Sequence, residues 1–267
     1  MKKLCVFLYR DWLNAASYKF EFIASLIGII ISSSTFFFIA KLIPAAEVAS
    51  LKPYGGDYFS FAIIGIAFSG ILNIFQNDLA GTIRTAQITG TFEALLVTPT
   101  RIPTILIGSS LYSFIFSLVS TILHITVALT IFDMQIGPVN WPAVLVVFIL
   151  MSLCFLSIGI LSASFILVYK KGNPFGWMFG SVSSLLGGVF FPVSVLPAGL
   201  KWISRLLPIT YSLEGLRKSF LSSIGFKDIL PEVTALIIFS VILLPVSFIV
   251  FRAALRKAKR DGSLTQY

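Results

Sequence analysis

Residues 233–251 read VTALIIFSVILLPVSFIVF and contain no Asp, Glu, Lys or Arg. A helix rises ~1.5 Å per residue, so this stretch is long enough to cross the ~30 Å hydrocarbon core of a bilayer. Its apolar residues do not alternate with polar ones, as they would in a strand of a membrane barrel. A helix also satisfies its own backbone in lipid. The stretch therefore predicts a transmembrane helix.

Charge-free stretches recur at residues 22–40, 58–77 and 102–132. The whole chain is 57% hydrophobic and 12% charged, with a mean hydropathy of +0.96, which is more apolar than a soluble domain. We predict an all-α membrane protein in which residues 1–267 form a single transmembrane domain. Residues 1–21 are expected to form an amphipathic interfacial helix. The six predicted spans are 22–43, 58–75, 104–132, 141–168, 174–191 and 233–251.

The distribution of Lys and Arg predicts the orientation of the chain. With both termini in the cytoplasm, most of the 20 basic residues face inward, as is typical of membrane proteins. The net charge of +9 then reflects contact with anionic lipid headgroups rather than with nucleic acid. If residues 174–191 were re-entrant, residues 193–230 and the C-terminal tail would exchange sides with equal numbers of basic residues. Charge alone therefore leaves the fifth span open.

Several classes of function lack the residues that they need. No GxxxxGK[ST] phosphate loop occurs, so the chain does not bind ATP in the P-loop manner. No Asp, Glu, Lys or Arg lies in the middle of a predicted span, where a secondary transporter generally binds its coupling ion. A secondary transporter or channel remains the alternative class. The scattered carboxylates and the cysteines predict no metal site, catalytic residue or cofactor: Asp57, Asp78, Glu93, Asp133, Asp228, Cys5 and Cys154.

The only histidine, His124, lies in an apolar stretch. A lone imidazole in a membrane span most often makes a hydrogen bond to a neighbouring helix, and a contact with substrate is the alternative.

Residues 77–103 form a predicted cytoplasmic loop that includes GTFEALLVTP at 90–99. The residues alone favour two interpretations equally. In one, the loop is a solvated connector in which Glu93 lies near the positive end of a short helix. In the other, the short helix docks on a partner, with Phe92 and Leu95 as apolar anchors and Arg84 and Glu93 as polar contacts.

Residues 187–197, GGVFFPVSVLP, and 207–217, LPITYSLEGLR, precede the last span. Their prolines divide residues 193–230 into two short helical pieces. Glu214 and Arg217 are three positions apart and are expected to pair on one helix face. An amphipathic surface loop is the alternative interpretation.

These three strings, in this order behind an N-terminal interfacial helix, resemble the permeases of type-2 ATP-binding-cassette exporters. The resemblance implies that residues 77–103 couple the permease to an ATPase and that residues 193–230 are extracellular re-entrant helices that close the exit. The implied ATPase-coupling residues are Arg84, Gly90, Thr91, Phe92, Glu93, Leu95 and Pro99. The implied exit-gate residues are Phe191, Pro192, Pro197, Pro208, Tyr211, Glu214 and Arg217.

The same resemblance implies a non-enzymatic, multi-pass subunit of the cytoplasmic (inner) membrane. It would export an amphiphilic or lipid-linked substrate, such as a polysaccharide, a glycolipid or a drug, with ATP hydrolysed by a separate subunit. The expected partners are that ABC ATPase, a second permease copy that most simply forms a homodimer, and membrane lipid. No polar binding constellation in the sequence identifies the cargo.

Overall fold

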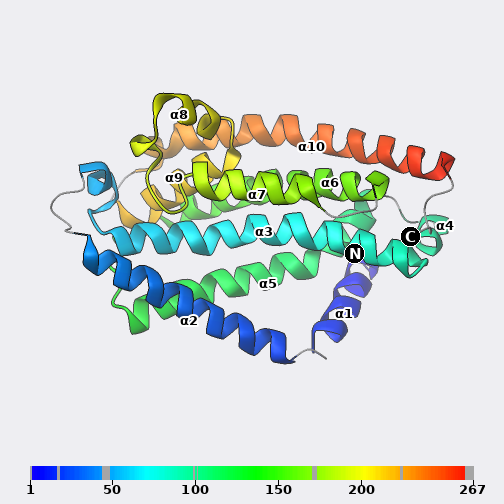
Figure 1. Ribbon diagram of the computed structural model, residues 1–267, viewed down its shortest axis with the longest axis horizontal. Helices are drawn as coiled ribbons and strands as arrows, with labels where there is room; N and C mark the ends of the chain where they lie inside the picture. The colour runs from blue at the N-terminus through cyan, green and yellow to red at the C-terminus, as the bar shows by residue number, and fades with distance from the viewer. Residues whose placement is uncertain are drawn as a thin grey trace.

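The computed structural model describes residues 2–16, 19–43, 49–98, 100, 102–169, 173–222 and 225–261. All regular elements in these ranges are helices, which confirms the all-α fold (Figure 1). They are α1 (Lys2–Ala16), α2 (Lys19–Leu42), η1 (Ala49–Tyr54), α3 (Tyr58–Ile88), α4 (Thr91–Val97), α5 (Ile102–Ile131), α6 (Trp141–Tyr169), α7 (Pro174–Leu186), η2 (Val193–Val195), α8 (Ala198–Arg205), α9 (Pro208–Leu221), η3 (Phe226–Ile229) and α10 (Leu230–Arg260).

Five helices in the described ranges are long and apolar enough to cross a membrane. They are Phe22–Leu42, Tyr58–Ile88, Ile102–Ile131, Trp141–Tyr169 and Phe226–Arg260. The predicted fifth span, residues 174–191, is not among them, because α7 ends at Leu186 after 13 residues. At ~1.5 Å per residue, α7 is ~20 Å long, which is shorter than the hydrocarbon core. The chain then turns at Gly188, where φ is 81°.

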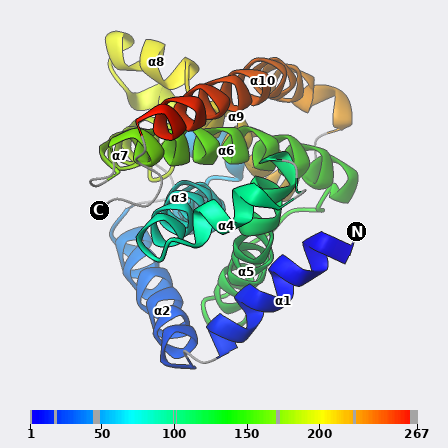
Figure 2. The same cartoon turned by 90° about the vertical axis from the view of Figure 1, so that its right-hand side faces the viewer.

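Helix α3 is the centre of the bundle (Figure 2). In its apolar stretch 72% of the residues are buried, against 44% or less in the other four candidate spans. Helices α5 and α6 pack along it, and α6 also packs against α10. The prediction ended this span at residue 75, but the helix is 31 residues long and continues to Ile88. Residues 77–103 are therefore largely helical, since the end of α3, α4 and the start of α5 all lie within them.

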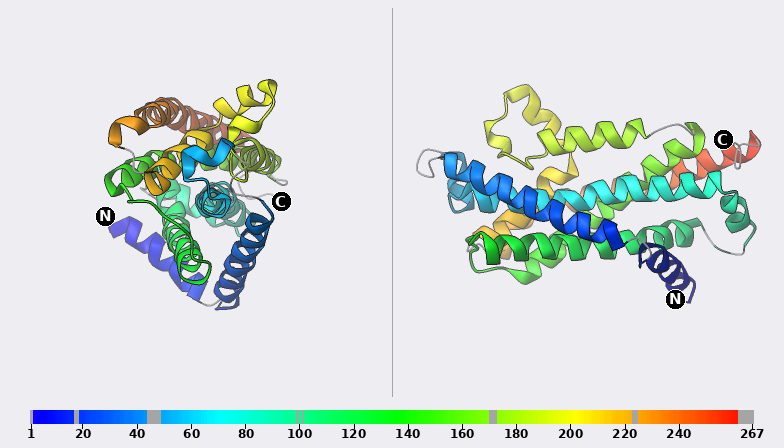
Figure 3. Two further views of the ribbon diagram at one scale, coloured as in Figure 1. Left: turned by 90° about the vertical axis from the view of Figure 1, so that its left-hand side faces the viewer. Right: turned by 60° about the horizontal axis from the view of Figure 1, so that its bottom comes forward.

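The two ends of the bundle differ (Figures 1 and 3). Helices α1 and α4 lie at the end where α10 terminates, and η1 and α8 lie at the opposite end. Helix α1 lies across the bundle axis, and its Phe7 ring packs on Gly108 of α5, within 3 Å of where a Cβ would lie. The buried Phe7 therefore holds α1 on the bundle.

Helices α3 and α6 approach closely at Gly159. A Cβ at this position would lie 2.5 Å from the carbonyl oxygen of Phe75. We expect Gly159→Ala to force the helices apart at a cost of about 1–3 kcal/mol, because the obstacle is backbone. The measurement is a lower midpoint temperature of unfolding in detergent micelles.

Gly70→Ala is the matched control on α3. No atom outside the helix backbone lies within 4 Å of a Cβ there, and Ala favours a helix over Gly by about 1 kcal/mol. Equal destabilisation by both variants would contradict the close approach at Gly159.

Candidate functional site

The turn between α3 and α4 depends on Gly90. The last turn of α3 closes with hydrogen bonds from the Thr89 N–H to the Thr85 oxygen and from the Gly90 N–H to the Gln87 oxygen. Gly90 then adopts φ 69°, a left-handed conformation in which a side chain is disfavoured. Helix α4 therefore starts immediately after α3 and leaves it in a fixed direction.

Helix α4 is held to the bundle by Phe92, which is 1% exposed. Its ring belongs to a core cluster that includes Leu106 of α5, Leu167 of α6 and Phe251 of α10. The expectation that Phe92 is an apolar anchor for a partner is therefore corrected. It anchors α4 to its own chain, and the sequence could not show this because the cluster joins four distant helices.

The other predicted coupling residues differ in exposure. Arg84, Thr91 and Glu93 are exposed, Leu95 is half-buried, and Pro99 lies outside the described residues. Two exposed apolar residues were missed, namely Ile88 at 56% and Val97 at 87% exposure. The sequence signal that could have identified Ile88 and Val97 is that they are isolated apolar residues near the two ends of a short predicted helix. We name Ile88, Glu93 and Val97, with Arg84, the α4 surface.

At the opposite end, Arg217 of α9 is 2% exposed. Its Nη1 and Nη2 donate to the carbonyl oxygens of Gly188 and Val189 at 2.7 and 2.9 Å, and its Nε donates to the Phe61 oxygen at 3.1 Å. The guanidinium also lies 3.4 Å from the centroid of the Phe61 ring. A single side chain thus binds the carbonyls that are left where the chain turns after α7, and ties them to α3.

The expected pair of Glu214 with Arg217 does not form. Glu214 instead accepts a hydrogen bond from the Tyr54 hydroxyl at 2.6 Å and lies 3.8 Å from the Lys218 amine. Lys218 also pairs with Glu232 at 2.8 Å. Burial and the Glu214 carboxylate raise the pKa of Tyr54 above its ordinary value, so the phenol stays protonated and remains a donor.

The remaining predicted gate residues shape the chain between α7 and α9. Pro192 and Pro197 precede η2 and α8, and Pro208 is the first residue of α9. The Tyr211 hydroxyl donates to the Arg205 oxygen at 3.0 Å, and Phe191 is half-buried. These residues lie at one end of the bundle with Glu214 and Arg217, far from the α4 surface (Figure 1).

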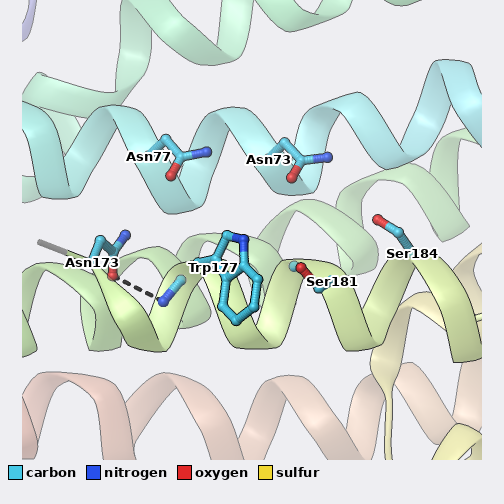
Figure 4. Close-up of a pocket in the computed structure, with 8 residues that line it drawn as sticks. Asn73, Asn77, Asn173, Trp177, Ser181 and Ser184 are labelled. Atoms are coloured by element: carbon cyan, nitrogen blue, oxygen red, sulfur yellow. Dashed lines mark hydrogen bonds between the residues drawn. The ribbon is translucent and has the colours of Figure 1, made fainter.

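A polar cleft of about 480 Å³ lies between α3 and α7, and sequence reasoning missed it. Figure 4 shows the side chains of Asn73 and Asn77 directed from α3 toward α7, and Trp177 on α7 beside them. The described residues that line it are uncharged: Asn73, Asn77, Asn173, Gly176, Trp177, Gly180, Ser181 and Ser184. The sequence contained a signal for the α3 wall of the cleft. Asn73 and Asn77 are four positions apart at the end of an apolar stretch, so they lie on one face of a helix.

Asn173 fixes the start of α7 against α3. Its Oδ1 accepts from the Gly176 N–H at 2.9 Å, and its Nδ2 donates to the Gln76 carbonyl oxygen at 3.4 Å. Gln76 itself is 1% exposed, and its side-chain nitrogen has no hydrogen-bond partner. A buried unsatisfied amide of this kind costs about 1–3 kcal/mol. Helices α3 and α7 thus meet at polar groups, and one of these groups, the side-chain nitrogen of Gln76, lacks a hydrogen-bond partner.

Replacing Arg217 tests the carbonyl-binding arrangement. We expect Arg217→Met to speed hydrogen exchange of the backbone amides at 188–196 by about tenfold or more, since three charged hydrogen bonds are lost. Arg205→Met, at an exposed residue of α8, is the control and should leave exchange there unchanged. Unchanged exchange in Arg217→Met would contradict the arrangement.

Comparison with known proteins agrees with this architecture. The family model described as ABC-2 type transporter matches residues 3–221, which extend from α1 to the end of α9. Inner membrane transport permease YadH of Escherichia coli (strain K12) is 24% identical over 212 residues, which cover 79% of this chain and 80% of YadH. Nodulation protein J of Sinorhizobium fredii (strain NBRC 101917 / NGR234) is 27% identical over 237 residues, which cover 87% and 85% of the two chains.

The matched residues include the turn at Gly90, the buried Arg217 and the cleft between α3 and α7. The chain therefore belongs to the ABC-2 type transporter family, as a multi-pass membrane permease subunit.

Proposed function

We propose that this chain exports an amphiphilic or lipid-linked substrate across the inner membrane, driven by ATP that a separate ABC subunit hydrolyses. Membership of the family supports the ATPase partner. The name of YadH, an inner membrane transport permease, supports the location. The observation that carries the proposal is the position of α4. This short helix exposes the α4 surface on one side, and on the other side it is fixed to the bundle core.

The packing of α4 suits the transmission of force. A partner that pushes on Glu93 or Val97 acts on a helix whose Phe92 contacts the core between α3, α5, α6 and α10. A close-packed core deforms little, so the displacement passes to the spans instead of being absorbed in a loose loop. The turn at Gly90 joins α4 to α3 with no intervening flexible segment.

In this proposal the end of the bundle with α1, α4 and the C-terminal end of α10 faces the cytoplasm. That end of α10 carries Arg252, Arg256, Lys257, Lys259 and Arg260, which suit the cytoplasmic side. Helices α8 and α9 then lie on the outer side as re-entrant segments. Helix α7, with the residues up to 191, completes a sixth crossing that begins as a helix and ends as a turn.

A second permease copy, most simply an identical one, completes the path. The apolar stretch of α2 is only 11% buried within the chain, so most of it is left to contact lipid or another copy. The cleft between α3 and α7 would form part of the path wall. A secondary transporter or channel is the competing class, and transport that follows a proton or sodium gradient without ATP would establish it.

Coupling is tested with Glu93→Arg and Val97→Asp in the complex of this chain with its candidate ATPase, purified and reconstituted in liposomes. We expect each variant to reduce co-purification of the ATPase, or the ATPase activity of the complex, by about tenfold, because each places an unfavourable charge in the contact. Lys201→Glu, in α8 at the opposite end, is the control and should behave as wild type. A wild-type permease that inserts normally but binds no ATPase would overturn the proposal.

The turn at Gly90 gives a second test of coupling. We expect Gly90→Val to strain the left-handed residue by about 1–2 kcal/mol, to displace α4 and to uncouple ATP hydrolysis from transport. Gly90→Asn should retain coupling, because Asn tolerates this conformation. The measurement is the ratio of substrate transported to ATP hydrolysed. An equal ratio in both variants would show that the direction of α4 is unimportant.

A further inference from the structure

The cleft between α3 and α7 has the chemistry of a ligand site. The described residues that line it offer carboxamide and hydroxyl groups and no charge. Amides and hydroxyls both donate and accept hydrogen bonds, which suits a ligand that also does both. A phosphate or an ammonium group would find no opposite charge on these walls. A hydroxyl-rich, uncharged group matches them on both counts.

A buried amide beside the cleft, behind Gly180 of its wall, has no hydrogen-bond partner. Gln76 is 1% exposed and its Nε2 is unsatisfied. A Cβ on Gly180 would lie 3.1 Å from the Gln76 Oε1 and 3.5 Å from the Asn73 Oδ1. Because residue 180 is Gly, these two carboxamides reach the wall of the cleft. Such groups normally find a partner in a folded protein, in a ligand or a water molecule.

Trp177 adds an apolar face beside the polar groups. Its indole is 75% exposed on α7, and Trp177 lines the same cleft as Asn73 and Asn77 of α3 (Figure 4). An exposed aromatic ring beside amide groups can stack on the apolar C–H face of a sugar ring while the amides bind its hydroxyls. Helix α7 also exposes Met178 and Leu185, which offer apolar surface to a hydrocarbon chain.

From these observations we propose that the cleft binds the uncharged, hydroxyl-rich headgroup, a carbohydrate or polyol, of an amphiphilic cargo. Asn73 and Asn77 bind its hydroxyls and Trp177 stacks on it. The cleft lies where the apolar part of α3 ends, so a headgroup there meets water while its chain stays in lipid. The proposal rests on the proposed function, because it treats the bound molecule as cargo for export. Binding at the cleft itself requires no ATPase.

Binding is measured by making Trp177 the sole fluorophore of its kind. The other three tryptophans are replaced in the variant Trp12→Phe, Trp141→Phe, Trp202→Phe, in nanodiscs of neutral lipid. Octyl glucoside, octyl phosphate and octyltrimethylammonium, each kept below its micelle concentration, share a chain and differ in headgroup. We expect a saturable change in Trp177 emission with octyl glucoside and a dissociation constant about tenfold weaker or more for both charged probes.

The walls are then tested with Asn73→Leu plus Asn77→Leu, which should weaken octyl glucoside binding by about tenfold. Thr126→Val, on the exposed side of α5, is the matched control and should bind as wild type. Equal binding of all three probes would overturn the headgroup class. Unchanged binding in the double Asn variant would overturn the site.

A second copy of the chain is the other possible occupant. Ser181→Cys, in a background of Cys5→Ser and Cys154→Ala, tests it by cross-linking. Rapid cross-linking between copies that octyl glucoside does not slow would show that the cleft is a contact between permeases, and would overturn the proposal. If the complex shows coupled ATPase activity but the chain binds no octyl glucoside, the headgroup site is wrong and the proposed function stands. If the chain binds octyl glucoside but no ATPase, the proposed function is wrong and the headgroup site stands.

Discussion

The structure depends on the burial of α3, an unbroken helix of 31 residues that other helices surround. A helix in lipid satisfies its own backbone, so it can run through the bundle without help from neighbouring groups. The same property makes it stiff along its axis. The carbonyl of Phe61 that Arg217 binds, the amides of Asn73 and Asn77, and the turn at Gly90 all lie on this helix or at its end. A displacement of α4 therefore reaches the cleft and the opposite end through one rigid element.

Polar side chains in the bundle fall into two groups. Many buried hydroxyls donate to a carbonyl one turn earlier in their own helix, as Ser110 does to Leu106 and Ser164 does to Ile160. These contacts remove a polar group from lipid and join no helices. A few side chains instead reach across helices. His124 lies 3.0 Å from the Ser32 hydroxyl, which confirms the expected hydrogen bond to a neighbouring helix and joins α5 to α2.

Sequence patterns predicted what depends on local composition. Three predicted spans, 22–43, 104–132 and 141–168, agree with α2, α5 and α6 to within a few residues, because a membrane span needs only continuous apolar residues. The end of α3 was predicted poorly, since the polar residues from Asn77 onward mark the edge of the lipid and not the end of the helix. Helix α7 was predicted too long for the opposite reason, because residues 187–191 are apolar but form a turn around Gly188.

What the sequence could not predict depends on residues that are distant in the chain. Arg217 was assigned to Glu214 by helix periodicity, but carbonyls at positions 61, 188 and 189 were its partners. Phe92 looked like a partner contact until four helices were seen to enclose it. The cleft joins position 73 to position 184, and neither α3 nor α7 alone contains a recognisable site.

The placement of charge supports our proposal that force enters at the end of the bundle. The described spans carry no Asp, Glu, Lys or Arg at mid-depth, where a secondary transporter generally binds its coupling ion. The buried Arg217 is no exception, because its partners include Phe61 in the first turn of α3 and the turn after α7. An uncharged cleft likewise releases an uncharged headgroup without the large desolvation cost of a buried ion. In the proposed function an ATPase supplies the energy for transport, and α4 is the exposed surface, fixed to the central helix, through which it would act.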